Sequence, residues 1–93
     1  MTAANERPKL ASKVRLRVDR HTGQTMLLFP EKGMALNATA AAVAELCTGA
    51  HDVTSIVATL AARFPGTSPD VIEREARAFL DALRERGLLE ASK

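Results

Sequence analysis

The sequence contains one cysteine and two histidines, the residue types that most often act as nucleophile, base or zinc ligand: Cys47, His21 and His51. A metal site needs three or four converging donors, and one cysteine with two distant histidines does not supply them. Catalysis by a cysteine needs an exposed, electropositive setting and a nearby base. Cys47 instead lies on the apolar side of an alanine-rich segment. We therefore expect a core cysteine, two surface histidines and no metal site.

Other catalytic patterns are also missing from the sequence. It contains no glycine-rich phosphate loop and no GxSxG nucleophile motif. A single cysteine excludes an internal disulfide and fits a reducing compartment. The first ten residues lack the apolar stretch of a secretory signal, and no apolar run approaches the ~20 residues that a membrane helix needs. We expect a cytoplasmic protein that is not an enzyme, has no catalytic residues and needs no cofactor.

The length and composition indicate one small domain. The chain has 93 residues, of which 46% are hydrophobic, enough for one modest core. Residues 1–12 are polar, contain Pro8 and show no periodicity, so they are predicted to be a flexible N-terminal arm. Residues 13–90 are predicted to form the folded domain.

The first part of that domain has the patterns of short strands. Val14, Leu16 and Val18 alternate with basic residues, which predicts a strand with its apolar side chains facing inward. Residues 19–24 form a turn with Gly23 in the left-handed position, and residues 25–29 form a second strand. A turn at residues 30–33 then leads to a third, very short strand at residues 34–36.

Three helices are expected in the remainder of the chain. The first spans residues 38–48 after an Asn37 cap, and the second follows an Asp52 cap. The third begins after Ser68 and ends at Gly87. Apolar residues recur at helical spacing in each of them. The predicted fold class is α+β, a three-stranded antiparallel sheet followed by three helices, winged-helix-like in composition.

A small winged-helix DNA-binding protein is one alternative for a chain of this kind. Base readout relies on Arg, Lys, Asn and Gln, but Arg63 is the only long basic residue on the exposed face of the second helix. Acidic residues outnumber basic ones along the third helix, which does not favour phosphates. Arg15 and Arg17 on the first strand are the best case for DNA, and a solvated strand face explains them equally well. The sequence therefore gives only weak support to DNA binding.

Peptide binding is the other possibility that the elements suggest. The short third strand could accept a further strand through its main chain. The third helix could provide an apolar floor, with basic rims formed by Arg74, Arg77 and Arg84. From periodicity alone, an ordinary core stripe with solvated arginines remains the simpler interpretation.

A resemblance shifts this balance toward a peptide. The chain from about Val14 to Leu89 resembles the pyrroloquinoline quinone (PQQ) biosynthesis protein D family, a branch of the recognition elements for ribosomally made peptides. Three segments carry it: Leu36-Asn37-Ala38-Thr39-Ala40-Ala41-Ala42-Val43 with Leu46 and Gly49; Ile56, Leu60 and Phe64; and Phe79-Leu80 with Leu83 and Gly87-Leu88-Leu89. The turn at residues 30–33 also fits that family.

The resemblance implies a function and a set of contacts. The family acts as a non-catalytic peptide chaperone, so residues 13–90 would be a peptide-recognition domain. Its partners would be the precursor peptide, protein A of the pathway, and a radical S-adenosylmethionine (SAM) enzyme, protein E, with no nucleic acid or membrane. The peptide would add a strand beside the third strand and lie against the third helix. The implied contacts are Met34, Ala35, Leu36, Asn37, Arg74, Arg77, Ala78, Asp81 and Leu83.

Overall fold

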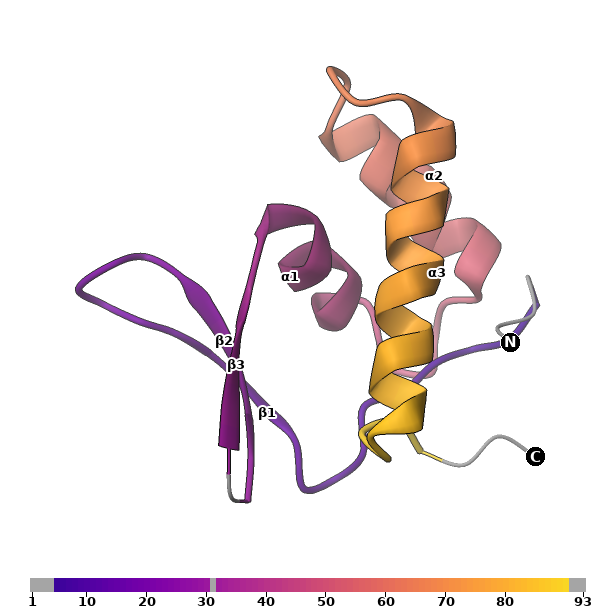
Figure 1. Cartoon of the computed structure of the whole chain (residues 1–93). Helices are drawn as coiled ribbons and strands as arrows, with labels where there is room; N and C mark the ends of the chain where they lie inside the picture. Colours follow the sequence, from indigo (N-terminus) through magenta and orange to yellow (C-terminus); the bar gives the residue numbers. More distant parts are fainter. Residues whose placement is uncertain (1–4, 31, 91–93) are drawn as a thin grey trace.

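The computed structural model describes residues 5–30 and 32–90, which form a small sheet beside three helices (Figure 1). The α+β prediction is confirmed, with three antiparallel strands followed by three helices. The elements are β1 (Arg15–Val18), β2 (Thr25–Phe29), β3 (Lys32–Leu36), α1 (Ala38–Glu45), α2 (Val53–Arg63) and α3 (Pro69–Glu85).

The sheet is a meander in which β2 lies between β1 and β3. Leu27 of β2 pairs with Leu16 on one side and with Met34 on the other. Leu27 is fully buried, so the face that it shares with these two residues is the core face. The third strand begins two residues earlier than predicted, at Lys32, because Phe29 and Lys32 still pair across the turn. Glu31, which belongs to the predicted turn, lies outside the described residues.

The hairpin that joins β1 to β2 projects away from the helices (Figure 1). Gly23 has a φ of 73°, the left-handed conformation that the turn was predicted to need. Val18 sits at the projecting end and is 59% exposed. The prediction that Val18 faces the core was therefore wrong, because its alternating pattern continues beyond the part of the sheet that the helices cover.

Side-chain caps begin all three helices as predicted. The side chains of Asn37, Asp52 and Ser68 accept hydrogen bonds from backbone N–H groups of the following turn. Gly87, with a φ of 71°, ends α3 in a Schellman motif, in which the Leu88 N–H donates to the Leu83 carbonyl at 2.9 Å. The turn folds Leu88 back under the helix, where it is buried.

The helix α1 ends at Glu45, three residues before the predicted end at Thr48. Thr48 instead pairs with Lys9 in an isolated β-bridge. The chain has to leave the helix to make this extended pairing, which explains the early end.

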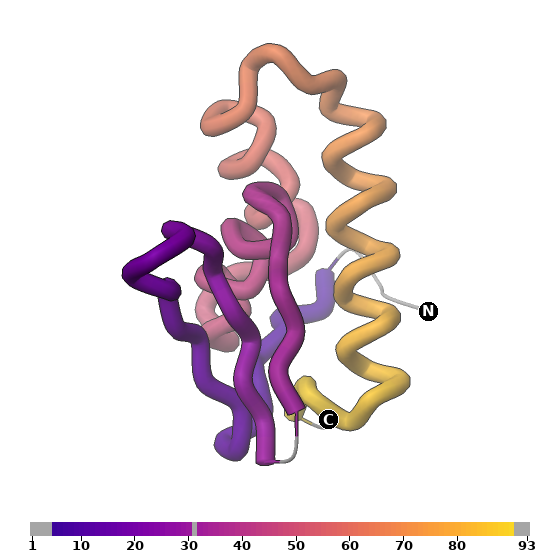
Figure 2. Tube along the Cα trace, turned by 60° about the vertical axis from the view of Figure 1, so that its left-hand side comes forward, coloured from indigo at the N-terminus to yellow at the C-terminus, as the bar shows by residue number. Residues whose placement is uncertain are grey.

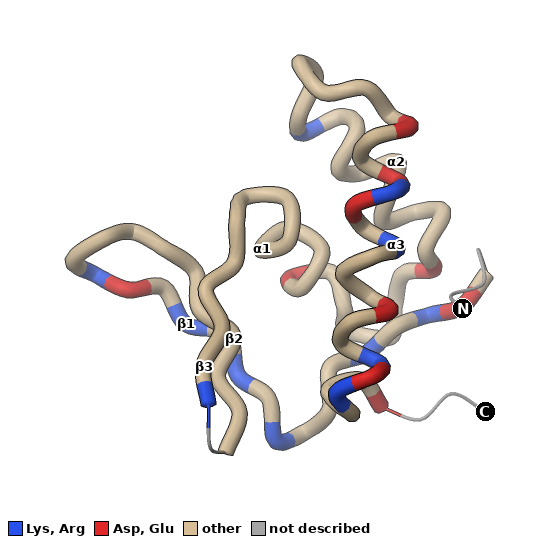
Figure 3. Tube along the Cα trace, in the orientation of Figure 1, with Lys and Arg blue, Asp and Glu red and all other residues tan. Residues whose placement is uncertain are grey.

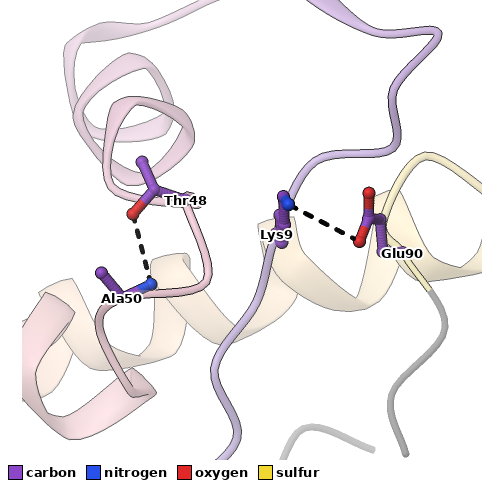
Figure 4. Close-up of polar contacts among 4 residues, drawn as sticks. All are labelled: Lys9, Thr48, Ala50 and Glu90. Atoms are coloured by element: carbon purple, nitrogen blue, oxygen red, sulfur yellow. Dashed lines mark hydrogen bonds and ion pairs between the residues drawn. The ribbon is translucent and has the colours of Figure 1, made fainter.

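Residues 6–11, which belong to the predicted flexible arm of residues 1–12, form backbone hydrogen bonds to distant parts of the chain. We call this segment the strap, because its backbone connects three distant parts of the chain. Glu6 accepts from the Val53 N–H at 3.0 Å, Leu10 donates to the Cys47 carbonyl at 3.0 Å, and Ala11 donates to the Leu88 carbonyl at 2.8 Å. Figure 4 shows the Lys9–Glu90 ion pair, 4.0 Å long, beside the Thr48–Ala50 hydrogen bond. These contacts join residues 6–11 to the segments around Cys47, Val53 and Leu88.

Two apolar clusters make the core. The first lies among the three helices and centres on Val43, Ile56 and Leu80. The second, which we call the sheet–helix cluster, lies between the sheet and the C-terminal half of α3. It includes Leu27, Leu36, Leu83 and Leu88. This second cluster holds α3 beside β3, so that the outer edge of the sheet faces the helix (Figure 2).

Candidate functional site

The hydrogen bonding of the β1–β2 hairpin determines which backbone groups of the sheet face outward. The Asp19 N–H donates to the Gln24 carbonyl at 2.8 Å, so these two residues form a hydrogen-bonded pair at the end of the ladder. Bonded and non-bonded pairs alternate along antiparallel strands. Gln24, Met26 and Leu28 therefore direct their backbone groups toward β1. It follows that Thr25, Leu27 and Phe29 direct theirs toward β3.

The same alternation leaves two residues of β3 with backbone groups pointing away from the sheet. Lys32, Met34 and Leu36 are the partners of Phe29, Leu27 and Thr25, so their N–H and C=O groups face β2. Gly33 and Ala35 face the other way, and both are exposed. Within the described chain, β3 has β2 as its only strand neighbour. We call the outward groups of Gly33 and Ala35 the β3 edge.

A hollow of about 290 Å³ lies between α1 and α3, next to the Leu36 end of β3, which is the upper end in Figure 1. Its floor includes the exposed Ala78 and the half-buried Phe79 of α3. Small and aromatic side chains at this point leave room for an apolar group from another molecule. We call it the Ala78 hollow, and its lining residues are Asn37, Thr39, Ala40, Glu75, Ala78 and Phe79.

A second hollow of about 450 Å³ lies at the Lys32 end of β3, the lower end in Figure 1. It lies between the end of β2 and the residues that follow α3. Three of its side chains are basic and three are apolar. Figure 3 shows basic positions at the lower ends of both β3 and α3. We call it the basic hollow, and its lining residues are Lys13, Phe29, Pro30, Lys32, Arg86 and Leu88.

The four predicted contacts around β3 have different roles in the structure. Ala35 belongs to the β3 edge, and Asn37 lines the Ala78 hollow while capping α1. Met34 and Leu36 turn their side chains to the core face, where Leu36 is 4% exposed. These two residues can shape the strand but do not present a side chain at its outer face.

Of the five contacts predicted on α3, Ala78 lines the hollow of described residues that lies beside the end of β3. Leu83 is fully buried in the sheet–helix cluster, so its side chain is not part of an exposed groove. Arg77 lies on the opposite flank of the core stripe, where its Nε is 3.0 Å from Glu73 Oε2. Arg74 and Asp81 lie between the flanks, on the outward side of the helix.

The three arginines predicted to form basic rims, Arg74, Arg77 and Arg84, line neither of the two hollows. Arg84 also lies on the far flank, where it pairs with Glu6 of the strap. Residues that line the two hollows but were not predicted as contacts include Glu75, Phe79, Lys32 and Arg86. Helical spacing places Glu75 and Ala78 on one flank of α3, but it does not show which flank faces β3.

Nucleophilic or metal chemistry finds no support in the part of the chain that the structure describes. Cys47 is 3% exposed, and burial raises the pKa of its thiol to about 12. The reactive thiolate is therefore scarce at neutral pH. Among residues 5–30 and 32–90, no three His, Cys, Asp or Glu side chains gather as a metal site. No described helix is long and apolar enough to cross a membrane.

The sequence profile of the family described as coenzyme PQQ synthesis protein D (PqqD) matches residues 24–89. The matched region runs from β2 to the residues that follow α3, and so includes both hollows except for Lys13. The chain belongs to the PqqD family. The predicted resemblance is confirmed by this match.

Relatives of known name agree with this assignment to PqqD. A PqqA binding protein of Rhizobium meliloti is 37% identical over 82 residues, covering 88% of this chain and 83% of the relative. A PqqA binding protein of Azotobacter vinelandii is 35% identical over 89 residues, covering 96% and 95%. The second alignment includes most of the strap, which the family profile does not.

Two solved structures share the fold. The PqqD part of Methylobacterium extorquens PqqCD, a stand-alone recognition element for ribosomally made peptides, matches with a TM-score of 0.82 and 30% identity, covering 98% of this chain and 96% of the other. TbiB1, solved in complex with the TbiA(beta) leader peptide, matches with a TM-score of 0.72, covering 91% and 98%. At 23% identity, the second match shows a shared fold alone.

Proposed function

We propose that this PqqD-family chain is a non-catalytic carrier of the PqqA precursor peptide in PQQ biosynthesis. The β3 edge is the observation that carries the proposal. Gly33 and Ala35 each offer one outward N–H and one outward C=O, the groups to which a further strand can bond. Relatives across most of the chain's length are PqqA binding proteins, which supplies the identity of the guest.

The arrangement beside the edge explains how side chains would add selectivity. An extended peptide alternates its side chains between two faces. Those that face α3 would meet the Ala78 hollow, where Phe79 provides an apolar surface. Main-chain hydrogen bonds would supply affinity for any extended segment, while this hollow would favour a segment with an apolar residue in register.

The carrier would act by tethering. A second partner is proposed from the family resemblance: a radical SAM enzyme, protein E of the pathway, to which the carrier presents its peptide in the cytoplasm. Holding the substrate on a protein that also docks the enzyme raises the local concentration of the substrate at the active site. This role needs no catalytic residue or cofactor on the carrier itself.

DNA binding is less well supported. Arg63, the one long basic residue on the outer face of α2, lies 3.6 Å from Glu45 Oε1. The other exposed residues of that face are short: Thr54, Ser55, Ala58, Thr59 and Ala62. Such a surface offers little for base readout.

Calorimetry with the synthetic PqqA peptide of Rhizobium meliloti tests the proposal, with a gel-shift assay on a DNA duplex at low salt beside it. The carrier should bind the peptide with one-to-one stoichiometry and should not shift the duplex. A shifted duplex without peptide binding would overturn the proposal.

A further inference from the structure

The basic hollow lies at the lower end of β3, outside the positions assigned to peptide contact by the family resemblance. Lys32 begins β3, Arg86 caps the end of α3, and Lys13 precedes β1. Three segments that are distant in sequence thus bring three cations to one opening. Among residues 5–30 and 32–90, no carboxylate pairs with any of these three side chains.

The floor of the basic hollow is apolar. Leu88 belongs to the sheet–helix cluster, Phe29 packs against that cluster, and Pro30 is the third apolar residue of the lining. Two methylene groups of a glutamate could lie on such a floor while the carboxylate reaches the cations, in the way that long charged side chains bury their stems. Arginine binds carboxylates in a two-pronged geometry, and lysine adds a point charge. The chemistry therefore fits an acidic side chain with an apolar stem or neighbour.

We propose that the basic hollow binds an acidic residue of the same peptide that adds to the β3 edge, and so sets the register of that peptide. This inference rests on the proposed function. The two hollows differ in charge: Glu75 lines the Ala78 hollow, whereas none of the described residues that line the basic hollow is acidic. A peptide with an acidic residue at one end of its bound segment would be attracted at the lower end and repelled at the upper end.

The geometry of β3 gives the spacing that the peptide must have. A strand rises about 3.3 Å per residue, so Lys32 and Asn37 lie about 17 Å apart along the edge. A bound strand covers that length with about five residues. Both hollows lie on the α3 side of the sheet, where the side chains of a strand recur at every second residue. The acidic residue in the basic hollow would therefore lie about four or six residues from the side chain in the Ala78 hollow. A shift of the peptide by one residue along β3 would turn both of these side chains to the other face of the sheet.

The test compares two double variants that lose the same charge. In Lys32→Gln/Arg86→Gln, the basic hollow loses two of its cations. In Arg17→Gln/Arg20→Gln, two exposed arginines are lost from the β1–β2 hairpin, and neither of them lines the basic hollow or the Ala78 hollow. Calorimetry with the Rhizobium meliloti PqqA peptide should show a three- to tenfold weaker affinity for the first variant, roughly the sum of two exposed ion pairs. The second variant should bind like the unmodified protein.

A scan of the peptide identifies the acidic residue. Each Glu or Asp of the peptide is changed in turn to Gln or Asn. One of these changes should weaken binding to the unmodified protein, yet have little further effect on Lys32→Gln/Arg86→Gln, as expected for two sides of one contact. That contact should also weaken as salt rises.

The outcomes separate this inference from the function on which it rests. An NMR titration with the peptide is compared with the calorimetric scan. If the peptide shifts the amide signals of Gly33 and Ala35 but no acidic residue is coupled to Lys32 and Arg86, the basic hollow does not bind the peptide. The proposed carrier function would then still hold. If the peptide leaves those two amide signals unchanged, strand addition itself fails. A loss of duplex DNA binding in Lys32→Gln/Arg86→Gln, with peptide affinity unchanged, would make the hollow a phosphate contact and overturn the inference.

Discussion

At the scale of single residues, Ala35 and Val18 occupy matching positions on the two edges of the sheet. Each lies on an outer strand, is exposed, and directs its backbone N–H away from β2 by the alternation of the ladder. They differ in what lies beside them, because β3 is next to α3 whereas the end of β1 projects from the molecule (Figure 2). This pair allows the role of one outward N–H to be isolated.

Replacing Ala35 with proline removes that N–H without removing a bond between β2 and β3, and proline is tolerated on edge strands. The Ala35→Pro variant should bind the PqqA peptide about three- to tenfold more weakly, since a hydrogen bond contributes about 1 kcal/mol. The Val18→Pro variant should keep full affinity. Calorimetry on both variants, with thermal unfolding to show that each is folded, makes the comparison. Equal affinity in the two folded variants would contradict strand addition at β3.

Ala78 offers a second test at the same scale. Changing Ala78 to Gln places a longer, neutral side chain in the Ala78 hollow, where it should compete with the peptide and weaken binding by about tenfold. The change is on an exposed helix position, so the free energy of unfolding should move by no more than about 0.5 kcal/mol. Ala62→Gln, an exposed position on α2, is the matched control. Unchanged affinity in Ala78→Gln would remove this hollow from the site.

At the scale of the elements, the cap of α2 links helix stability to pH. The Asp52 carboxylate accepts from the Ser55 N–H at 2.8 Å, and this hydrogen bond holds the pKa of Asp52 below its ordinary 3.8. A carboxyl whose pKa is lower in the folded state stabilises the fold above its unfolded pKa, and this contribution is lost as pH falls through the folded value.

Urea unfolding between pH 5 and pH 2 measures this effect. The unmodified protein should lose stability as the pH falls below about 3.8. Asp52→Asn keeps a capping side chain but cannot titrate, so its loss of stability over the same range should be smaller. Identical pH profiles for the two proteins would show that the carboxylate makes no such contribution.

The attachment of the strap can be tested by removing the charge of one of its side chains. Glu6 reaches Arg84 of α3, and their side chains are 15% and 34% exposed. The Nε of Arg84 is buried and has no hydrogen-bond partner among the described residues, so the strap's carboxylate is the main compensation for this guanidinium. Loss of that carboxylate leaves a partly buried charge without its partner, which is costly.

Glu6→Gln should lower the free energy of unfolding by about 1–2 kcal/mol. Glu45→Gln is the control, because its ion pair with Arg63 is about half exposed on both sides and should contribute less than about 1 kcal/mol. Urea denaturation compares the two variants. Equal effects would mean that the strap is held by its backbone hydrogen bonds and not by this ion pair.

At the scale of the whole molecule, the sequence predicted the fold where local patterns and long-range packing agree. The stripe of Ile72, Ala76, Leu80 and Leu83 along α3, the three helix caps and the Gly23 turn are all observed. The strap was missed because its partners are backbone groups at Cys47, Val53 and Leu88, and its own side chains show no periodicity. Pairing between distant backbones leaves no pattern in a single polar segment.

The candidate site was predictable in part for a related physical reason. Helical spacing shows that Ala78 and Arg77 lie on opposite sides of the core stripe, but not which side faces β3. That choice depends on where α1 and the strap lie. The structure places Asn37 and the first turn of α1 beside Ala78, and the strap beside Arg84. The basic hollow needs Lys13, Lys32 and Arg86 from three segments, and no local pattern connects them.

Amide hydrogen exchange of the carrier with and without the Rhizobium meliloti PqqA peptide tests the central claim most directly. In the free protein, the outward N–H groups of Gly33 and Ala35 should exchange quickly, because they bond only to solvent. Strand addition predicts that peptide saturation slows the exchange of these outward amides, while the outward N–H of Val18 on the opposite edge stays fast. A saturated complex in which Gly33 and Ala35 exchange as fast as in the free protein would contradict it.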